Sequence, residues 1–243
     1  MDVKKIKVVA MDLDGTLTQH RQPIPEATKK ALDQLAERYH LLMVGAGQVG
    51  RIHKQMGFYP IDIVGNYGMQ YARYSPKTGE MEFVRDLTIP VKDRAEIEEK
   101  VALLRKTYGY ETFAGDGVEY HPSGCITIPL LGTQAKHEDK IAFDPDRKKR
   151  RAFYDHVKRL FPEYTVFVGG SSSFDMAPLP YNKCNALETY CRENGLEHEN
   201  VVFIGDDYGL GGNDESVYVS DFPFLTVDDY RDFPKVAAKL LED

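Results

Sequence analysis

Hydrophobic residues form short unbroken runs in the first and last thirds of the chain, and amphipathic stretches separate these runs. Runs rich in β-branched residues predict buried strands at 6–11, 40–44, 61–65, 200–205 and 222–227. Apolar residues three and four positions apart predict helices at 26–38, 183–194 and 230–242. A further helix is expected after the strand at 40–44 and ends at about residue 56. This alternation is typical of a parallel sheet with helices on both faces, which is an α/β fold.

The pattern changes between about residue 80 and residue 178. Strand-like segments there mix polar and apolar residues: "EMEFVRD", "YETFAG", "GVEYH", "CITIPLL" and "YTVFVG". Charged helices are expected among them, near 92–107 and 145–161. We therefore predict a small α+β cap inserted at 87–179 into a parallel-sheet core formed by residues 1–86 and 180–243.

Composition narrows the class of protein. With 42% hydrophobic and 28% charged residues, the 243-residue chain suits a soluble globular protein. Its net charge of -7 argues against general affinity for nucleic acid or for a membrane surface. No apolar run approaches the roughly 18 to 20 residues of a membrane helix. The three cysteines form no CxxC pair, and we expect thiols in a reducing, cytoplasmic setting.

One basic run, "DRKKRR" at 146–151, is a candidate for contact with nucleic acid. It continues into apolar residues at helical spacing: Phe153, Val157, Leu160 and Phe161. We therefore interpret the run as the solvated face of a helix, with no nucleic-acid partner.

Two carboxylates directly follow the first predicted strand, in "VVAMDLDGTLT" at 8–18. Ligands of open α/β sheets bind at the carboxyl ends of strands, where Asp12 and Asp14 are expected. Two carboxylates so close together repel each other and need a cation or a proton. Mg²⁺ is the usual cation where phosphate completes its shell. A calcium loop of the EF-hand type would need Glu at its twelfth position, where Pro23 stands.

A second acidic cluster, "VVFIGDDYGLGGNDESV" at 201–217, follows a later strand. Asp206, Asp207 and Asp214 lie in its glycine-rich loop, so both clusters can converge on one ion. Lys183 begins a predicted helix just after the inserted unit. It could neutralise a phosphate, although a lysine at a helix start is also typical of an ordinary surface position.

The segment "GAGQVG" at 45–50 has the glycine pattern of a dinucleotide-binding turn. An NAD site needs an acidic residue at the end of the next strand, but that strand ends in Gly65-Asn66. The segment instead fits a turn whose backbone amides bind phosphate at a helix N-terminus. The candidate phosphate-binding residues are Gly45, Ala46, Gly47 and Gln48.

Taken in order, "DLDGT", the phosphate turn, Lys183 and "GDD…GGND" resemble the haloacid dehalogenase-like (HAD) phosphotransferases. The place of the insertion resembles type IIB members. "GTLTQHRQPI", "GGSSSFD" at 169–175 and "GDDYGLGGND" at 205–214 are similar to the eukaryotic-type phosphomannomutase family. The resemblance covers nearly the whole chain. It implies a HAD-like Rossmannoid core with an inserted α+β cap.

The resemblance also implies roles for the acidic residues. Asp12 is the expected nucleophile, because the aspartyl phosphate that it forms is labile, and Asp14 is the expected general acid and base. Lys183 is expected to assist as a catalytic residue. Mg²⁺ is expected on Asp12, the backbone carbonyl of Asp14, and Asp206. Residues expected to support these groups without touching the ion are Asp207, Asn213 and Asp214, with Asp214 orienting Lys183.

For the substrate, the resemblance implies sugar contacts from Arg21, Ser173 and Asp175. The family usually has Ser or Thr where this chain has Gly47. That departure removes a hydroxyl donor, and Gln48 is a possible substitute.

A mutase needs a second anion site in the cap, where phosphomannomutases use arginines. His121 and Thr133 occupy two such positions here, and Lys136 or Arg147 could compensate. We therefore expect a Mg²⁺-dependent phosphatase acting on a sugar phosphate or a similar small phosphate monoester, with phosphomannomutase as the alternative. A non-catalytic sensor is disfavoured because Asp12 and Asp14 are both present. The oligomeric state stays open, and a homodimer through the cap is one arrangement compatible with the resemblance.

Overall fold

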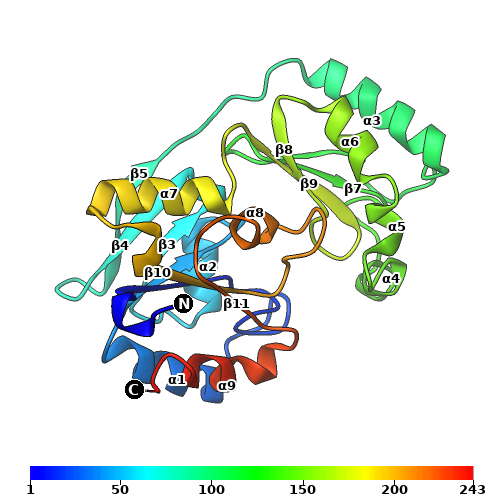
Figure 1. Ribbon diagram of the computed structural model, residues 1–243. Coiled ribbons are helices and arrows are strands. Elements are labelled where there is room, and N and C mark those ends of the chain that lie inside the picture. Colours follow the sequence, from blue (N-terminus) through cyan, green and yellow to red (C-terminus); the bar gives the residue numbers. More distant parts are fainter. Residues whose placement is uncertain (243) are drawn as a thin grey trace. The chain divides into compact units, whose positions relative to one another are not determined.

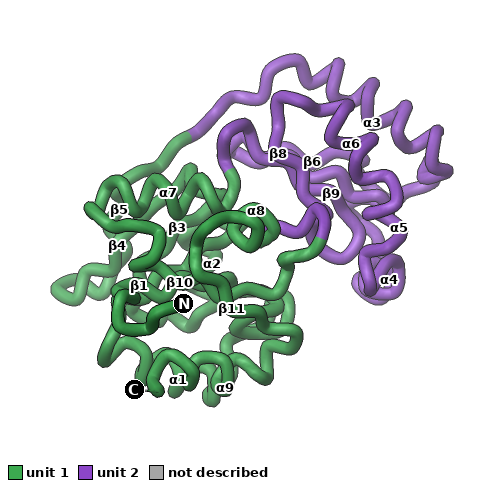
Figure 2. Tube along the Cα trace, in the orientation of Figure 1, with its two compact units in different colours: residues 1–87, 182–209, 214–243 green, residues 88–181, 210–213 purple. Residues whose placement is uncertain are grey.

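The computed structural model describes residues 1–242, which form two compact units (Figure 2). Unit 1 contains Met1–Leu87, Asn182–Gly209 and the chain from Asp214 onwards, and unit 2 contains Thr88–Tyr181 and Leu210–Asn213. The sequence-based boundaries of the cap were 87 and 179. They did not include Leu210–Asn213, which joins unit 2 through a hydrogen bond of 2.8 Å from the Val168 amide to the Gly211 carbonyl.

Unit 1 is built on a seven-stranded sheet with the order β11-β10-β1-β2-β3-β4-β5 (Figure 1). Its first five strands are parallel, as the alternating pattern predicted. They are β11 (Phe224–Thr226), β10 (Val201–Gly205), β1 (Val8–Met11), β2 (His40–Val44) and β3 (Asp62–Gly65). The α/β fold class is therefore confirmed.

An antiparallel hairpin extends this sheet at one edge. It consists of β4 (Gln70–Ser75) and β5 (Glu80–Asp86). Strand β5 lies in the stretch whose pattern we associated with the insertion, but it pairs within the sheet of unit 1. Strand β4 was not predicted, because its sequence "QYARYS" is only partly buried and has no continuous apolar run.

Helices cover both faces of the parallel sheet. Side chains of β1 alternate between the two layers: Val9 and Met11 join one buried cluster, and Val8 and Ala10 join the other. The first layer contains α1 (Glu26–Ala36), α2 (Val49–Gln55) and α9 (Phe233–Ala238), and the second contains α7 (Lys183–Asn194) and α8 (Glu215–Tyr218). Burial on both faces explains why these strands read as unbroken apolar runs.

Unit 2 has a four-stranded antiparallel sheet with the order β6-β7-β9-β8. The strands are β6 (Glu119–Tyr120), β7 (Ile126–Pro129), β9 (Ser173–Pro178) and β8 (Tyr164–Phe167), and the helices are α3 (Arg94–Tyr108), α4 (His137–Phe143), α5 (Lys148–Arg151) and α6 (Tyr154–Leu160). One face of the sheet and apolar residues of α3 and α6 form a single buried cluster. The opposite face carries the polar residues described below.

Two details of unit 2 differ from the sequence-based predictions. The segment "YETFAG" is not a strand, because α3 ends at Gly109 with φ 75° and Gly115 turns the chain with φ 79°. The helix expected at 145–161 is interrupted between α5 and α6.

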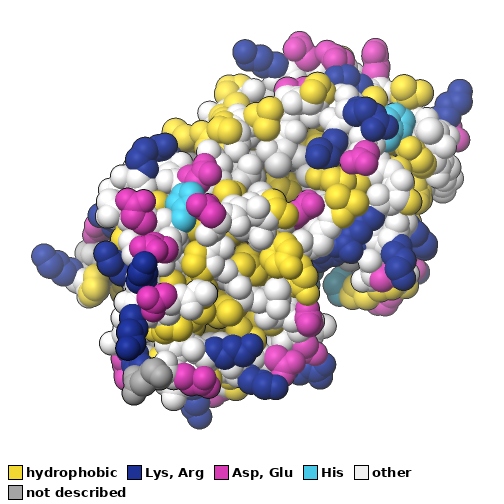
Figure 3. Space-filling view, in the orientation of Figure 1, with side chains coloured by type: hydrophobic (Ala, Val, Ile, Leu, Met, Phe, Trp, Pro, Cys, Tyr) yellow, Lys and Arg dark blue, Asp and Glu magenta, His cyan; other side chains and the backbone are white. Residues whose placement is uncertain are grey.

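On the face shown in Figure 3, acidic and basic side chains are interspersed over unit 1. Within residues 1–242, no helix combines the length and apolar character needed to cross a membrane.

Candidate active site

The end of β1 positions the first candidate, Asp12. Residues of β1 pair in parallel with β10, so that Met11 lies opposite Ile204. The Asp12 amide continues this ladder by donating to the Ile204 carbonyl at 3.0 Å. Asp12 and Asp206 therefore leave neighbouring strands at the same edge of the sheet, as the sequence predicted. The Asp12 side chain is buried.

Lys183, the first residue of α7, is fully buried, unlike an ordinary surface lysine. Its ammonium group donates to Asp12 Oδ1 at 2.5 Å and to Asp214 Oδ1 at 2.7 Å. The other oxygen of Asp214, Oδ2, accepts from the Asp207 amide at 3.0 Å. Asp214 thus lies between the lysine and the loop after β10, where it holds the ammonium group next to Asp12.

Asp206 approaches the first motif at a position where a side chain would not fit. A Cβ on Gly15 would lie 2.3 Å from Asp206 Oδ2, and Gly15 has a φ of 100° that favours glycine. The Thr16 hydroxyl donates to Asp206 Oδ1 at 2.9 Å. The glycine and threonine of "DLDGT" therefore bring the second acidic cluster against the first.

The cluster has more acidic than basic groups. Carboxylate oxygens of Asp12, Asp206 and Asp214 all lie within 4.8 Å of one another, and a single ammonium group, that of Lys183, bonds to two of them. Three oxygen donors with surplus negative charge fit a hard divalent cation such as Mg²⁺. Asp214 accepts from Lys183 and from the Asp207 amide, so Asp12 and Asp206 are the better candidates for ligands.

The same crowding changes the pKa values. Burial raises the pKa of Asp12 to about 8; Lys183 opposes this shift, and the charges of Asp214 and Asp206 add to it. Burial lowers the pKa of Lys183, but Asp12 and Asp214 outweigh this effect and raise it to about 12. The lysine is therefore the stable cation of the site, and a further positive charge would help Asp12 to stay ionised.

Asp14 lies outside the three-carboxylate group. Its Oδ1 accepts from the backbone amide of Arg21 and from the Gln55 side chain, both at 2.7 Å. Its Oδ2 is 3.7 Å from Arg51 and 3.9 Å from His20. Asp14 is thus fixed separately from Lys183, which suits a group with a different chemical role from that of Asp12.

The turn at 45–48 contains a basic partner that sequence reasoning missed. A Cβ on Gly47 would lie 2.2 Å from the Arg51 guanidinium, so the departure from Ser or Thr leaves room for this side chain. Arg51 also contacts Gln55 at 2.8 Å, and both residues contact Asp14. The available signal was their spacing: Gly47, Arg51 and Gln55 follow one another at intervals of four residues, from the turn before α2 to the last residue of that helix.

The turn is also held by residues that follow β3. The Gly47 carbonyl accepts from the Asn66 amide at 2.8 Å, and the Val49 amide donates to the Gln70 side chain at 3.0 Å. Gln48 precedes α2 and makes no side-chain cap to it. The roles of Gly45, Ala46 and Gln48 in binding phosphate stay predictions.

Ser173 and Asp175 lie on β9 and therefore in unit 2. Asp175 Oδ1 accepts from the Thr127 hydroxyl at 2.9 Å, and this hydroxyl lies 2.9 Å from His121 Nε2. Ser173 donates to the Gly169 carbonyl at 3.1 Å. Burial raises the pKa of Asp175, and the Thr127 bond opposes this shift. These residues form a connected polar row on the sheet face opposite the apolar cluster.

A buried ion pair supports the turn before β9. Arg150 is fully buried and pairs with Asp144 at 2.8 Å. It also donates to the carbonyls of Ser173 at 2.9 Å and Gly170 at 3.3 Å. The solvated face inferred for the basic run holds for the exposed Lys148 and Lys149 but is wrong for Arg150. Sequence spacing alone did not reveal this pairing.

The remaining cap candidates have local contacts in unit 2. The Thr133 hydroxyl accepts from the Asp116 amide at 2.9 Å, which ties it into a turn. Lys136 is exposed before α4, and Arg147 precedes α5 with a φ of 59°. Asn213 falls in the segment of the 205–214 loop that belongs to unit 2.

Comparisons with known proteins agree on family and fold. A family model described as eukaryotic phosphomannomutase matches residues 112–238, just over half of the chain. Phosphomannomutase from Saccharomyces cerevisiae is 26% identical over 227 residues, covering 88% of this chain and 85% of that protein.

Solved structures with similar folds include phosphatases. The N-terminally truncated IMP-nucleotidase of Plasmodium falciparum has a TM-score of 0.71 at 13% identity, with 99% of this chain and 71% of that chain covered. A HAD-superfamily phosphatase from Bacteroides thetaiotaomicron has a TM-score of 0.63 at 16% identity, with coverage of 96% and 93%. These likenesses confirm the HAD fold that the sequence motifs implied.

Proposed function

Because this chain belongs to the eukaryotic phosphomannomutase family, we propose that it moves a phosphoryl group between two hydroxyl positions of a hexose. The protein is a HAD-superfamily enzyme of the phosphotransferase and phosphatase class. The family and its named relatives favour the mutase over the simple phosphatase that we expected from the sequence. The observation that carries the proposal is the buried Lys183 held between Asp12 and Asp214, with Asp206 beside them.

In the proposed first half-reaction, Asp12 attacks phosphorus and the bond to the sugar oxygen breaks. Asp14 gives its proton to that departing oxygen. An aspartyl phosphate is left on Asp12, which is suited to this role because an acyl phosphate readily passes its phosphoryl group on. The bonds from Arg21 and Gln55 to Asp14 Oδ1 leave Oδ2 as the oxygen proposed to carry the proton.

In the second half-reaction, a different sugar hydroxyl attacks the aspartyl phosphate and gives its proton to Asp14. Asp12 is thereby regenerated. Asp14 takes up one proton in this step and gave one in the first step, so it also returns to its starting state. Lys183 neutralises negative charge next to Asp12 in both directions. Positioning and charge neutralisation are what phosphoryl transfer mainly requires.

We propose that Asp12, Asp206 and the backbone carbonyl of Asp14 would hold Mg²⁺. When bound, the ion would supply positive charge against the phosphoryl oxygens and the surplus of carboxylates. We further propose that unit 2 selects the sugar through Ser173 and Asp175, and that Arg21 contributes from unit 1.

Hydrolysis is a second candidate function, and one specific observation favours it. His121 is hydrogen-bonded to Thr127, and Thr133 lies in a turn, where the related mutases are expected to have arginines for a second phosphate. With a weaker second anion site, water would compete more effectively for the aspartyl phosphate.

The partition between the two products tests the proposal. Enzyme incubated with mannose 1-phosphate or glucose 1-phosphate, Mg²⁺ and the matching 1,6-bisphosphate should form the 6-phosphate faster than inorganic phosphate. Omitting the bisphosphate should suppress isomerisation. If phosphate release dominates with bisphosphate present, the hydrolase replaces the mutase. If neither product forms from these or other sugar phosphates, hexose-phosphate chemistry is ruled out.

A further inference from the structure

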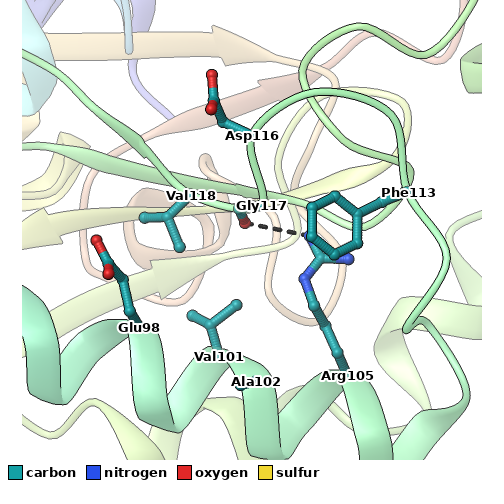
Figure 4. Close-up of a pocket in the computed structure, with 8 residues that line it drawn as sticks. All are labelled: Glu98, Val101, Ala102, Arg105, Phe113, Asp116, Gly117 and Val118. Carbon is teal, nitrogen blue, oxygen red and sulfur yellow. Dashed lines mark hydrogen bonds between the residues drawn. The ribbon is translucent and has the colours of Figure 1, made fainter.

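Unit 2 has a cavity of about 330 Å³ between α3 and the loop that follows this helix (Figure 4). The arginine in its wall, Arg105, is 4% exposed, and its two terminal nitrogens donate to four backbone carbonyls. Figure 4 shows the Phe113 ring next to the guanidinium, whose carbon is 4.1 Å from the ring centre. Arg105 therefore holds the loop in place and offers no reachable donor to a ligand.

Arg51 in unit 1 differs from Arg105 in its exposure and in the use of its donors. Its side chain is 45% exposed. Nη1 of Arg51 donates to Gln55 Oε1 at 2.8 Å and is 3.7 Å from Asp14 Oδ2. Among residues 1–242, no protein acceptor binds its Nε or its Nη2. These two nitrogens form the edge of a guanidinium that can bind two oxygens of a phosphate at once.

The Nε–Nη2 edge of Arg51 lies beside Gly47. A Cβ on Gly47 would be 2.2 Å from Nη2 and 2.5 Å from Nε, so the guanidinium occupies the space that a side chain at position 47 would fill. The φ of Gly47 lies outside the left-handed region, and its backbone therefore does not demand glycine. The position of the Arg51 guanidinium is what makes the missing Cβ necessary.

Gln55 fixes the guanidinium in this place. The side-chain amide of Gln55 donates to Asp14 Oδ1 at 2.7 Å and to the Gln22 carbonyl at 3.1 Å, and its Oε1 accepts from Arg51. Both ends of the Gln55 side chain are therefore engaged. A donor that is already held in place loses less conformational entropy on binding than a mobile one. Arg51 is thus preorganised beside the turn before any phosphate binds.

The turn next to this edge has unused donors of its own. In the part of the chain that the structure describes, residues 1–242, the backbone amides of Ala46, Gly47 and Gln48 donate to no protein acceptor. Successive backbone amides of this kind can bind an anion. Strand β2 pairs in parallel with β1, so the turn leaves the sheet at the same edge as Asp12. A phosphoryl group on Asp12 is therefore expected within reach of the turn.

We propose that Arg51 is a catalytic residue that binds the transferred phosphoryl group through its Nε–Nη2 edge. The guanidinium takes the place of a side chain at position 47 and donates to two non-bridging phosphoryl oxygens, and the turn amides bind alongside it. Its charge adds to that of Lys183 in balancing the negative charge of the phosphoryl group and the carboxylates. This inference rests on the proposed transfer of a phosphoryl group to Asp12, but it holds equally for isomerisation and for hydrolysis.

The test uses tungstate as the probe, a tetrahedral oxyanion like phosphate but without a sugar, and the full chain with Mg²⁺ present. Isothermal titration calorimetry gives the dissociation constant of tungstate for each variant. Arg51→Ala should weaken tungstate binding at least about 10-fold, because a charge-assisted pair of hydrogen bonds is lost. Lys54→Ala removes an exposed charge of the same helix. It is the matched control and should bind tungstate as the wild type does.

Gly47→Ala tests the position of the guanidinium. The added methyl group meets the far end of a flexible side chain, so the fold should survive while the guanidinium is displaced, and tungstate binding should weaken several-fold. In the double variant Gly47→Ala/Arg51→Ala, the methyl group should cause no further loss, because it acts only through Arg51. Gly50→Ala is the matched control, since nothing lies within 4 Å of a Cβ on Gly50.

Three results would overturn the proposal: no tungstate binding by the wild type, equal tungstate affinity in Arg51→Ala and Lys54→Ala, or a loss in Gly47→Ala that persists in full when Arg51→Ala is also present. If Gly47→Ala does not fold, the comparison of Arg51→Ala with Lys54→Ala decides alone. Tungstate binding needs no turnover, so these results are distinct from the product partition that tests the proposed function. A working mutase can fail this test, and a chain that forms no 6-phosphate can pass it.

Discussion

Each unit of this protein buries a cation against carboxylates, but the two groups differ in charge balance. In unit 2, Arg150 meets one carboxylate, Asp144, and its other bonds go to backbone carbonyls. In unit 1, Lys183 faces three clustered carboxylates. The first group is neutral as a pair, whereas the second has excess negative charge.

The difference separates a structural role from a chemical one. A buried pair with matched charges and satisfied bonds can hold a turn in place, and removing one partner leaves an uncompensated charge. A cluster with unmatched charge is stable only with help from a cation or proton, and such clusters are frequent at reactive sites. Loss of a carboxylate should therefore have opposite consequences in the two units.

The largest expected effect is on turnover in Asp12→Asn. We expect activity to fall at least about 1,000-fold, because an amide cannot form the aspartyl phosphate. Lys183 keeps its bond to Asp214 in this variant, so the urea midpoint should not decrease. Steady-state turnover and urea unfolding of the same sample provide the two measurements. Near-normal turnover would remove Asp12 from the role of nucleophile.

Asp144→Asn makes the matching change in unit 2. It leaves Arg150 buried without its counter-charge, and we expect a loss of about 3 kcal/mol in the free energy of unfolding. The exposed Asp146, which pairs with Lys148 at the surface, is the control, and Asp146→Asn should leave stability unchanged. A stable Asp144→Asn would show that the pair in unit 2 is not what holds the turn before β9.

Arg51→Ala sharpens the comparison within unit 1, because Arg51 is the basic side chain against Gly47. If it contacts the transferred phosphate, kcat/KM should fall about 10- to 100-fold, as expected for loss of a charge-assisted bond worth about 1.5 to 3 kcal/mol. Lys54→Ala changes an exposed charge of the same helix and should have little effect. If kcat/KM is the same in Arg51→Ala and Lys54→Ala, Arg51 has no role in binding the transferred phosphate.

The smallest effect concerns pH. Burial raises the pKa of Asp144, but the bonds from Arg150 and from backbone amides outweigh burial and lower it overall. A carboxyl group whose pKa is lower in the folded state stabilises the fold. This contribution is complete at pH values above the pKa of the unfolded state, about 3.9, and is lost as the pH falls through the pKa of the folded state.

The stability difference between wild type and Asp144→Asn should therefore be constant above about pH 5 and should shrink below about pH 4, by about 1.4 kcal/mol for each pKa unit of lowering. Urea unfolding at a series of pH values measures this difference. A difference that does not change down to about pH 2.5, well below about 3.9, would contradict the role given to Asp144.

Much of unit 1 could be predicted because its strands are buried on both faces. The runs around Val8–Met11 and Val201–Gly205 are continuous and apolar, and the motifs that follow them converge for topological reasons. The hairpin of β4 and β5 escaped prediction because its pattern is mixed. Unit 2 was predicted only in outline, since its sheet has one polar face and short strands.

The features that could not be predicted from the sequence depend on contacts between residues that are far apart in the chain or that meet only in the folded structure. The burial of Arg150 depends on carbonyls of the turn at 169–173, which no periodicity reveals. Arg51 became a candidate only when its position against Gly47 was visible. The family resemblance implied that Asp214 orients Lys183. The complete burial of the Lys183 side chain was visible only in the structure.

The central claim is that Asp12 carries the phosphoryl group, and direct trapping tests it most simply. Enzyme mixed with Mg²⁺ and a hexose 1,6-bisphosphate should be quenched in acid within the first turnover and examined by intact-mass and peptide mass spectrometry. The account predicts one added phosphoryl group, located on the peptide containing Asp12 and lost on treatment with hydroxylamine. It also predicts no adduct in Asp12→Asn. A phosphoryl group on another residue, or none during continuing turnover, would contradict the account.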